Sequence, residues 1–375
     1  MDLYLLSCRN TASSVSCDPV YELENLIAST CNATILAPSY RPAVRRARST
    51  GGKVNRWVEK AFGKTIGRYE PVSPILPATT GPKVLLVITI CGADLSLLSA
   101  IKGWRQQFDC VAAYVFDAWG LPIYPSFTQQ LDHLFVPMPE LITSLHQGLN
   151  IPVSFLPFGV DALCQGSIAT DRPIDVISYG RIPQPFHNAF AAAFNQPQSS
   201  QLYYRATPRR RDYAPALPYE QREDQRDRQL FFQLLRRTKL ALAFDTLYPG
   251  MREFPYSFVT LRWFEGAATG CTIIGKRPTT PVADELLNWE DATIEIPDDP
   301  LAAIAFVQAL LADSSRLETI RQRNYWNALA QHDWRWRIQQ IFQTLNLPIP
   351  HQLAHELKSV EAKIAQLSSI PALVA

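Results

Sequence analysis

The sequence has no apolar run long enough to cross a lipid bilayer. Its longest apolar stretches, near 84–91 and 301–311, fall short of the ~20 residues that a transmembrane helix needs. The amino-terminal residues also lack the charged start and the apolar core of a signal peptide. We therefore expect a soluble, cytoplasmic protein.

Metal-binding patterns are missing as well. No CxxC pair and no Cys/His cluster with metal-ligand spacing occurs. His351 and His355 stand four residues apart, but Glu356 follows the second histidine and no third ligand is apparent, so we predict no metal site. The odd number of scattered cysteines favours free thiols in a reducing compartment; they are Cys8, Cys17, Cys31, Cys91, Cys110, Cys164 and Cys271.

The chain also lacks an excess of one charge. It has 36 basic and 34 acidic side chains, a net charge of +2, so the molecule as a whole is not expected to bind nucleic acid. The 16 glycines follow no period, and 47% of the residues are hydrophobic, which excludes collagen-like structure and intrinsic disorder. At 375 residues, the chain should form two globular domains.

What the sequence does contain is a regular alternation of strand and helix patterns. Such an alternation predicts parallel sheets covered by helices on both faces. The expected fold class is therefore α/β, with two Rossmann-like parallel-sheet domains facing a cleft and with carboxyl-terminal helices. The expected strands are 2–7, 33–38, 83–90, 110–116, 133–136, 152–156, 174–179, 201–204, 239–244 and 271–275. The expected helices are 20–30, 95–107, 126–131, 139–147, 186–194, 227–237, 258–269, 301–311, 315–345 and 350–369.

The segment from Ser257 to Gly275 carries the strongest chemical signal. Ser257 is expected to cap helix 258–269, so that the first backbone N–H groups, at Phe258 and Val259, face an anion such as a diphosphate. Glu265 lies beside the apolar stripe of this helix. Its carboxylate either binds a ribose diol or lies on the helix surface in solvent.

Three segments together resemble the retaining glycosyltransferases of the GT-B fold, and within them the branch that includes the CgeB-like spore-maturation proteins. The resemblance extends over roughly residues 80–345 and is weak in the first 80. The three segments are Leu156-Pro-Phe-Gly-Val-Asp161, Asp175-Val-Ile-Ser-Tyr-Gly-Arg181 and Phe264-Glu-Gly-Ala-Ala-Thr-Gly-Cys-Thr-Ile-Ile-Gly275.

This resemblance implies a division of labour between domains. Residues 1–165 would form the acceptor-side domain, residues 166–345 the nucleotide-sugar-binding domain, and residues 346–375 a helical tail, with the carboxyl-terminal helices returning to the first domain. Glu265 would bind the nucleotide ribose, and Arg181, preceded by Gly180, would contact the diphosphate. The reaction implied is a metal-independent, retaining transfer of a sugar from a nucleoside diphosphate sugar to an acceptor hydroxyl, with no cofactor.

The sequence departs from the family pattern at two positions. Ser257 stands where many relatives carry a second Glu, which puts a direct sugar contact there in doubt. The Lys that relatives often place after the diphosphate Arg is missing, and His187 is the only ionisable substitute. His187 either donates to phosphate or is a half-exposed histidine at a helix start. Arg262 either supplies the missing cation or is a surface arginine.

In the first domain, Asp117 follows the strand 110–116. It is either a catalytic group near the reacting sugar or a cap for the next turn. Asp94 is expected to cap helix 95–107.

A local basic stretch stands out at 41–68, with nine basic residues and one acidic residue, Glu59. It either contacts an anionic membrane face or an acidic acceptor, which would make the protein peripheral at the inner membrane face, or it is a solvated connector. Arg209, Arg210 and Arg211 more closely resemble a solvated loop.

Two alternatives to a transferase remain open. A nucleotide-sugar epimerase has the same architecture but would need several catalytic carboxylates and a histidine in the cleft. A catalytically degenerate module would bind a nucleotide sugar or a partner protein without turnover.

Overall fold

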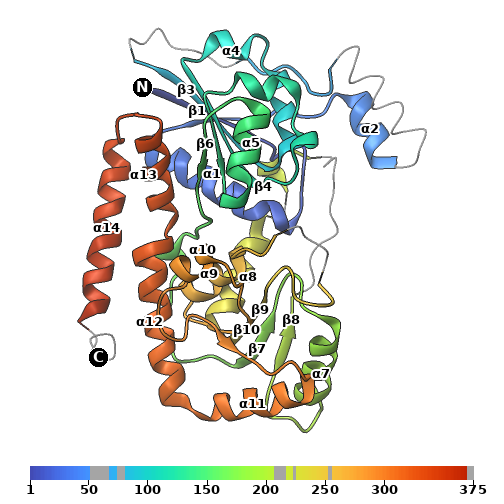
Figure 1. The fold of residues 1–375 in the computed structure, drawn as a ribbon, viewed down its shortest axis with the longest axis vertical. Helices are drawn as coiled ribbons and strands as arrows, with labels where there is room; N and C mark the ends of the chain where they lie inside the picture. The colour runs from blue at the N-terminus through green and yellow to red at the C-terminus, as the bar shows by residue number, and fades with distance from the viewer. Residues whose placement is uncertain (51–66, 74–80, 207–216, 223–224, 252–255, 370–375) are drawn as a thin grey trace. The chain divides into compact units, whose positions relative to one another are not determined.

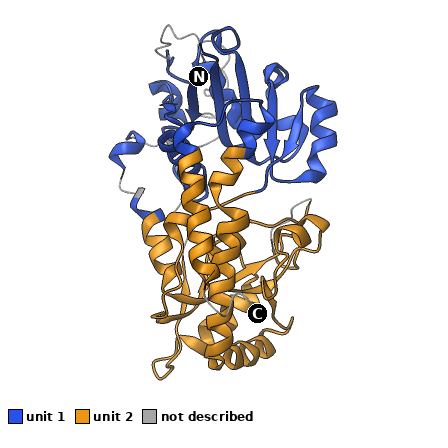
Figure 2. Ribbon diagram, turned by 90° about the vertical axis from the view of Figure 1, so that its left-hand side faces the viewer, with its two compact units in different colours: residues 1–157, 209–228, 340–353 blue, residues 158–208, 229–339, 354–375 orange. Residues whose placement is uncertain are grey.

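The computed structural model describes residues 1–375 except 51–66, 74–80, 207–216, 223–224, 252–255 and 370–375 (Figure 1). The chain divides into two compact units (Figure 2). Unit 1 comprises residues 1–157, 209–228 and 340–353, and unit 2 comprises residues 158–208, 229–339 and 354–375. Each unit contains one parallel sheet.

The sheet of unit 1 has six strands in the order β2-β1-β3-β4-β5-β6, and every neighbouring pair is parallel. β3 lies near the middle and shows why the sequence forms this sheet. Its run Lys-Val-Leu-Leu-Val-Ile-Thr-Ile-Cys is buried along its whole interior, as expected for a strand with both faces covered. The strands are β1 (Asp2–Ser7), β2 (Thr34–Leu36), β3 (Lys83–Cys91), β4 (Cys110–Asp117), β5 (His133–Val136) and β6 (Val153–Phe155).

The helices of unit 1 include short 3-10 segments. The predicted helix 95–107 is wrong as a single element, because Gly103 at φ 64° separates a 3-10 helix from a short α-helix. Asp94 does cap, since its Oδ2 accepts the Cys91 N–H at 3.1 Å. The elements are η1 (Val15–Cys17), α1 (Asp18–Cys31), α2 (Pro42–Thr50), η2 (Gly92–Ala100), α4 (Trp104–Gln107), η3 (Leu121–Ile123), η4 (Ser126–Gln130), η5 (Pro139–Leu141), α5 (Ile142–Leu149) and η6 (Tyr219–Gln221).

The sheet of unit 2 has five strands in the order β11-β10-β9-β7-β8, again parallel throughout. β9 is therefore the central strand, with β7 on one side and β10 on the other. The short edge strand β11 was not expected from the sequence. The strands are β7 (Ile174–Ser178), β8 (Tyr203–Arg205), β9 (Thr238–Phe244), β10 (Thr272–Lys276) and β11 (Ile294–Glu295).

Aromatic side chains of α7 fill the core on one side of this sheet. Phe186, Phe190 and Phe194 are buried against β-strand residues such as Leu242 and Phe244. The remaining helices are α6 (Ala162–Gln165), α7 (Gln184–Phe194), α8 (Gln225–Arg236), α9 (Leu261–Ala268), α10 (Pro281–Leu286), α11 (Pro300–Ala312), α12 (Ser314–His332), α13 (Trp334–Thr344) and α14 (His351–Ser368).

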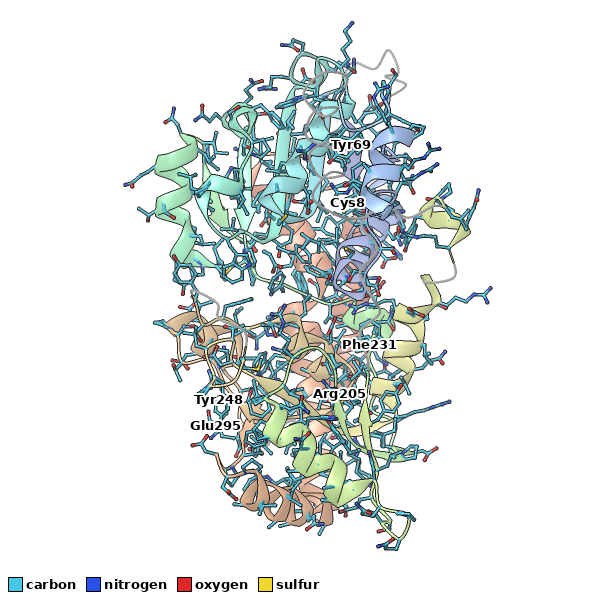
Figure 3. The ribbon with its side chains drawn as sticks, turned by 90° about the vertical axis from the view of Figure 1, so that its right-hand side faces the viewer. Cys8, Tyr69, Arg205, Phe231, Tyr248 and Glu295 are labelled. Atoms are coloured by element: carbon cyan, nitrogen blue, oxygen red, sulfur yellow. The ribbon has the colours of Figure 1, made fainter. Side chains whose placement is uncertain are left out.

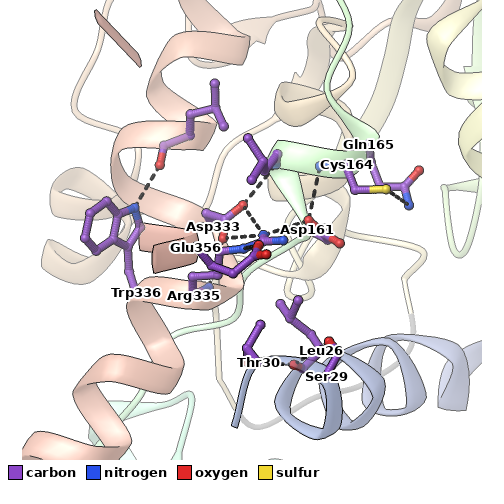
Figure 4. Close-up of polar contacts among 12 residues, drawn as sticks. Leu26, Ser29, Thr30, Asp161, Cys164, Gln165, Asp333, Arg335, Trp336 and Glu356 are labelled. Atoms are coloured by element: carbon purple, nitrogen blue, oxygen red, sulfur yellow. Dashed lines mark hydrogen bonds and ion pairs between the residues drawn. The ribbon is translucent and has the colours of Figure 1, made fainter. Parts of the chain in front are cut away.

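The predicted helix 315–345 is broken at Asp333, which is extended at φ −64° and ψ 138°. A buried cluster holds the break in place (Figure 4). The Arg335 guanidinium donates to Asp333 Oδ1 at 3.0 Å, to Asp161 Oδ1 at 2.8 Å and to Glu356 Oε2 at 2.9 Å. Asp161, the last residue of the Pro-Phe-Gly-Val-Asp turn, also caps α6.

The return of the carboxyl-terminal helices to the first domain stays a prediction, but one part of this region does belong to unit 1. Residues 340–353 belong to unit 1, and Gln340 Nε2 donates to the backbone oxygen of Phe155 at 3.2 Å. The domain limits expected from the sequence, and the cleft, stay predictions.

Candidate functional site

In unit 2, the carboxyl ends of the two central strands carry most of the predicted donor-site residues. β7 pairs with β9 so that Ser178 lies opposite Leu242. Tyr179, Gly180 and Arg181 follow β7, and Asp245 follows β9. Ligands of open parallel sheets bind at this edge. A ligand site is therefore expected at these loops.

Arg262 of α9 joins the two strand ends. Its Nη1 donates to the backbone oxygen of Arg181 at 2.8 Å, and its Nη2 donates to the backbone oxygen of Phe244 at 3.2 Å. In return, the Tyr179 hydroxyl donates to the Arg262 backbone oxygen at 2.8 Å. The structure therefore brings Arg181 and the start of α9 together, and Arg262 is a half-buried bridge rather than a surface arginine.

Positive charge accumulates at this junction. Burial, the largest cause, lowers the pKa of the Arg262 guanidinium to about 10, and the charge of Arg181 acts in the same direction. Both arginines lie near the amino end of α9, which itself carries partial positive charge. A bound anion would offset this repulsion.

Gly180 makes the close approach possible. Its backbone is left-handed at φ 71°, and a Cβ atom there would lie 3.2 Å from Arg262 Nη1. Glycine adopts this conformation without steric penalty. Gly180 therefore lets the Arg262 guanidinium lie against the backbone next to Arg181.

The predicted cap of α9 is wrong. The helix begins at Leu261 with Thr260 at the N-cap, and no side chain caps it. The β-branched pair Val259-Thr260 favours an extended backbone, so the chain enters the helix later than expected. Ser257 lies before the helix, and its hydroxyl donates to Asp245 Oδ1 at 2.8 Å.

Phe258 and Val259 precede α9 and have buried side chains. The Phe258 ring packs 6.4 Å from the Phe158 ring, centroid to centroid. These two residues therefore position the segment by packing. The amides at the amino end of α9 begin at Leu261, not at Phe258 as expected.

Glu265 is only 4% exposed. The alternative of a surface carboxylate in solvent is therefore wrong. A buried carboxylate needs polar partners to offset its loss of hydration, and its negative charge is among the groups that raise the pKa of Arg262. Its role toward a ribose stays a prediction.

His187 lies half-buried in the first turn of α7. Its Nδ1 lies 2.9 Å from the Tyr203 hydroxyl, which lies 2.7 Å from Ser178 Oγ. Burial and the charge of Arg205 lower the pKa of the imidazole, and Arg205 ends β8 (Figure 3). Both causes disfavour the charged imidazole, and the role of His187 toward a phosphate stays a prediction.

Sequence reasoning missed a polar group at the end of β10. Lys276 Nζ pairs with Asp298 Oδ1 at 3.0 Å, and the Tyr248 hydroxyl donates to the same oxygen at 3.0 Å (Figure 3). Asp299 caps α11.

In unit 1, Asp117 is the last residue of β4 and lies opposite Cys91 of β3. It therefore lies at the carboxyl edge of its own sheet, as expected. Its role as a catalytic group or a cap stays a prediction.

A buried polar cluster of Glu24, Ser7 and Arg9, at the carboxyl edge of the unit 1 sheet, was not expected from the sequence. Glu24 of α1 is fully buried and accepts from Ser7 Oγ at 2.5 Å and from Arg9 Nη2 at 2.8 Å. Burial raises the pKa of this carboxyl to about 7. The Arg9 guanidinium also lies 4.7 Å from the Tyr219 ring centroid.

The basic stretch 41–68 is described only in part. α2 carries Arg45, Arg46 and Arg48 of this stretch, and the Arg48 guanidinium lies 4.7 Å from the Tyr40 ring centroid. Residues 51–66 and the run Arg209–Arg211 lie outside the described residues. In the part of the chain that the structure describes, no three or more His, Cys, Asp or Glu side chains are grouped to hold a metal ion. Within the same residues, every helix is too short or too polar to cross a membrane.

Residues 210–343 match a protein-family model described as glycosyl transferase-like. This match includes Asp245, Ser257, Arg262 and Glu265. A search of curated proteins gave no match.

Among solved structures, HepE of Anabaena in complex with UDP and glucose is similar to the chain. The two are 10% identical, with a TM-score of 0.51, over 92% of this chain and 99% of HepE. An alpha-glucosyltransferase in complex with UDP and a 13-mer DNA is 9% identical, with a TM-score of 0.49, over 92% of this chain and 98% of that one. The predicted fold class, two parallel-sheet α/β units of the GT-B type, is confirmed.

Proposed function

We propose that this protein transfers a sugar from a nucleoside diphosphate sugar to an acceptor hydroxyl, and that unit 2 binds the donor. The observation that carries this proposal is the junction of Arg181 with α9. Arg262 Nη1 reaches the Arg181 carbonyl at 2.8 Å, so two cationic side chains and an uncapped helix start meet at the carboxyl edge of a parallel sheet.

This arrangement suits a diphosphate. Backbone N–H groups at a helix amino end, together with the positive end of the helix, favour phosphate groups. Arg181 is exposed. The diphosphate would lie between Arg181 and the first amides of α9.

The same groups fit the chemistry of transfer. The bond between the anomeric carbon and the diphosphate oxygen breaks, a bond from that carbon to the acceptor oxygen forms, and the acceptor loses its hydroxyl proton. Negative charge grows on the leaving diphosphate. Arg181 and the α9 amides are placed to stabilise that charge in the transition state, and we propose that no divalent metal is needed.

We further propose that transfer retains the anomeric configuration and that the chain is related to the CgeB-like branch. These finer statements rest on the resemblance of the three segments ending at Asp161, Arg181 and Gly275. The match of residues 210–343 to a glycosyl transferase-like model agrees with the broader class. HepE, which shares the fold, is seen with UDP and glucose, so UDP-glucose is the first donor to test.

The test incubates the protein with UDP-, GDP-, ADP- and TDP-glucose in the presence of EDTA and follows thermal stabilisation and nucleotide release. Stabilisation by one nucleotide with slow release of its diphosphate supports the proposal. Arg181→Ala should reduce release, and Glu265→Ala should weaken nucleotide binding. The anomeric configuration of the product, read by NMR, tests retention.

Other outcomes favour the alternatives. Stabilisation without turnover, even with candidate acceptors, indicates a binding module. Interconversion of the sugar indicates an epimerase. Unchanged binding and release in both Arg181→Ala and Glu265→Ala would remove this site from the proposal.

A further inference from the structure

A carboxylate at the end of β9 has no role in the diphosphate site. Asp245 follows the central strand of the sheet, and its backbone N–H donates to the Lys276 oxygen at 2.8 Å. Its side chain is half-buried. It therefore lies at the same carboxyl edge as Arg181 and Arg262, within unit 2.

One oxygen of this carboxylate is fixed. Ser257 Oγ donates to Asp245 Oδ1 at 2.8 Å, and Thr246 Oγ1 lies 3.3 Å from the same atom. Thr246 has a single hydroxyl proton, and its shorter contact, 2.7 Å to the Tyr256 backbone oxygen, takes that proton. Ser257 is thus the group that orients the carboxylate.

The second oxygen is left for another donor. Within the described ranges, every hydrogen bond to the Asp245 carboxylate falls on Oδ1, and Oδ2 accepts none. A carboxylate oxygen accepts strong hydrogen bonds. A carboxylate fixed through one oxygen and open at the other is prepared to accept from a ligand.

The neighbouring cations of the described chain make their hydrogen bonds and salt bridges to groups other than Asp245. The guanidinium of Arg262 donates to the Arg181 and Phe244 carbonyls, and Lys276 pairs with Asp298. In the described part of the chain, no Lys or Arg nitrogen forms a salt bridge with Asp245. Among the described residues, the carboxylate acts on Arg262 only through its charge, which is among the charges that raise the Arg262 pKa.

This charge decides which part of a donor it can bind. A carboxylate repels phosphate oxygens, whereas hydroxyl groups donate to it. Two parts of a nucleoside diphosphate sugar supply such hydroxyls, the ribose and the transferred sugar, and the expected role of Glu265 accounts for the ribose. The geometry points to a sugar-binding role.

We propose that Asp245 Oδ2 accepts a hydrogen bond from a hydroxyl of the donor sugar, and that Ser257 is a positioning residue that orients Asp245. The inference rests on the proposed function, because it needs the diphosphate at Arg181. Many relatives carry a Glu at the position of Ser257, so the sequence left a sugar contact at that position in doubt. The inference gives the sugar contact to Asp245, directly after β9.

The test compares the affinities of UDP and UDP-glucose by calorimetry for wild type, Asp245→Asn and Ser257→Ala. A hydrogen bond to a charged group contributes about 1.5–3 kcal/mol, so Asp245→Asn should weaken UDP-glucose binding at least about tenfold. UDP, which lacks the transferred glucose, should bind the variant within about twofold of its affinity for wild type. Ser257→Ala should show the same selective loss, smaller in size.

Glu295→Gln is the control, because Glu295 is an exposed carboxylate on the edge strand β11 of the same sheet (Figure 3). It should leave both affinities unchanged. The thermal unfolding midpoint of each variant, measured without ligand, separates loss of fold from loss of contact.

The outcomes distinguish this inference from the proposed function. If UDP binds normally and Asp245→Asn weakens UDP and UDP-glucose equally or not at all, the sugar contact is overturned while the donor site stands. Equal affinity of wild type for UDP and UDP-glucose also overturns it. If none of the nucleotides tested above binds wild type, the proposed function fails, and this inference fails with it.

Discussion

Arg262 donates to the backbone oxygen of Arg181 at 2.8 Å, which joins the start of α9 to the loop after β7. The two residues are 81 positions apart in the chain. Arg262 thereby holds the backbone of Arg181 in position. The exposed Arg181 side chain is therefore attached to a fixed backbone. Four predictions follow from this arrangement and from the buried charges around it.

Glu265→Gln should weaken nucleotide binding about tenfold or more. Gln keeps the shape of Glu but loses the charge, and hydrogen bonds to charged groups are worth about 1.5–3 kcal/mol. Calorimetry with UDP, or with whichever nucleotide stabilises the wild type, measures the change. Glu285→Gln, an exposed carboxylate on α10, is the matched control. Equal affinities in both variants would exclude Glu265 from the nucleotide site.

Gly180→Ala should reduce nucleotide affinity and turnover. The left-handed backbone at φ 71° costs a non-glycine residue roughly 1–2 kcal/mol, and the new Cβ would lie 3.2 Å from Arg262 Nη1. The strain shifts the backbone that meets the diphosphate. Activity and unfolding midpoint together report the effect.

Gly67→Ala separates strain from function. Gly67 has a similar φ of 79°, but its Cβ would meet nothing within 4 Å. It should lower stability by a similar amount without changing nucleotide affinity. A parallel loss of affinity in both variants would mean that general destabilisation, not the site, is responsible.

Stability should fall as the pH is lowered from about 6.5 toward 3, partly through His332. Its Nε2–H donates to the Leu286 backbone oxygen at 2.8 Å, and its Nδ1 accepts from Arg337 Nη2 at 3.2 Å. Burial, followed by the charge of Arg337, lowers the pKa of His332 to about 3. The unfolded chain therefore binds a proton first, and acid favours unfolding.

Denaturant unfolding at pH 7 and pH 5 checks the sign. His332→Gln keeps a donor and an acceptor but does not titrate, so its stability should depend less on pH in this interval. His355→Gln, exposed on α14, should behave like wild type. If the free energy of unfolding of His332→Gln changed between pH 7 and pH 5 as much as that of wild type, the prediction would be contradicted.

Arg335→Met should destabilise the protein by about 3 kcal/mol or more. It leaves the fully buried Asp333 without its main cationic partner, and breaking a buried ion pair typically costs about 3–5 kcal/mol. Arg323→Met removes a pair with Glu290, whose side chain is 76% exposed, and should cost about 1 kcal/mol or less. Urea midpoints of the two variants would show the contrast, and equal losses would refute it.

The arrangement of strands was largely readable in the sequence. Strand β5 was predicted with its observed limits, and the apolar run of β3 within one residue of its observed end. A strand buried on both faces needs consecutive apolar residues, and this requirement is local. The predicted strand 174–179 ends directly before Gly180 and the exposed Arg181. The place of these two residues at a strand end could therefore also be predicted from the apolar run.

Two wrong predictions of helix limits concern side chains that hydrogen-bond to residues distant in the sequence. Ser257 was expected to bond to the backbone of its own helix, and instead its hydroxyl reaches Asp245. Helix 315–345 was expected to continue, and Asp333 ends it because its carboxylate accepts from Leu163 N and from Arg335. Asp245 could have been found, since it directly follows a predicted strand.

The sequence alone thus determined the alternation of strands and helices, the two parallel sheets and the place of the strand-end loops, because hydrophobic periodicity acts over a few residues. Only the tertiary structure decided that Arg262 holds Arg181, that Glu265 is buried and that Ser257 orients Asp245. Those contacts join residues from separate loops and strands, and which polar groups pair is settled only when folding removes them from water.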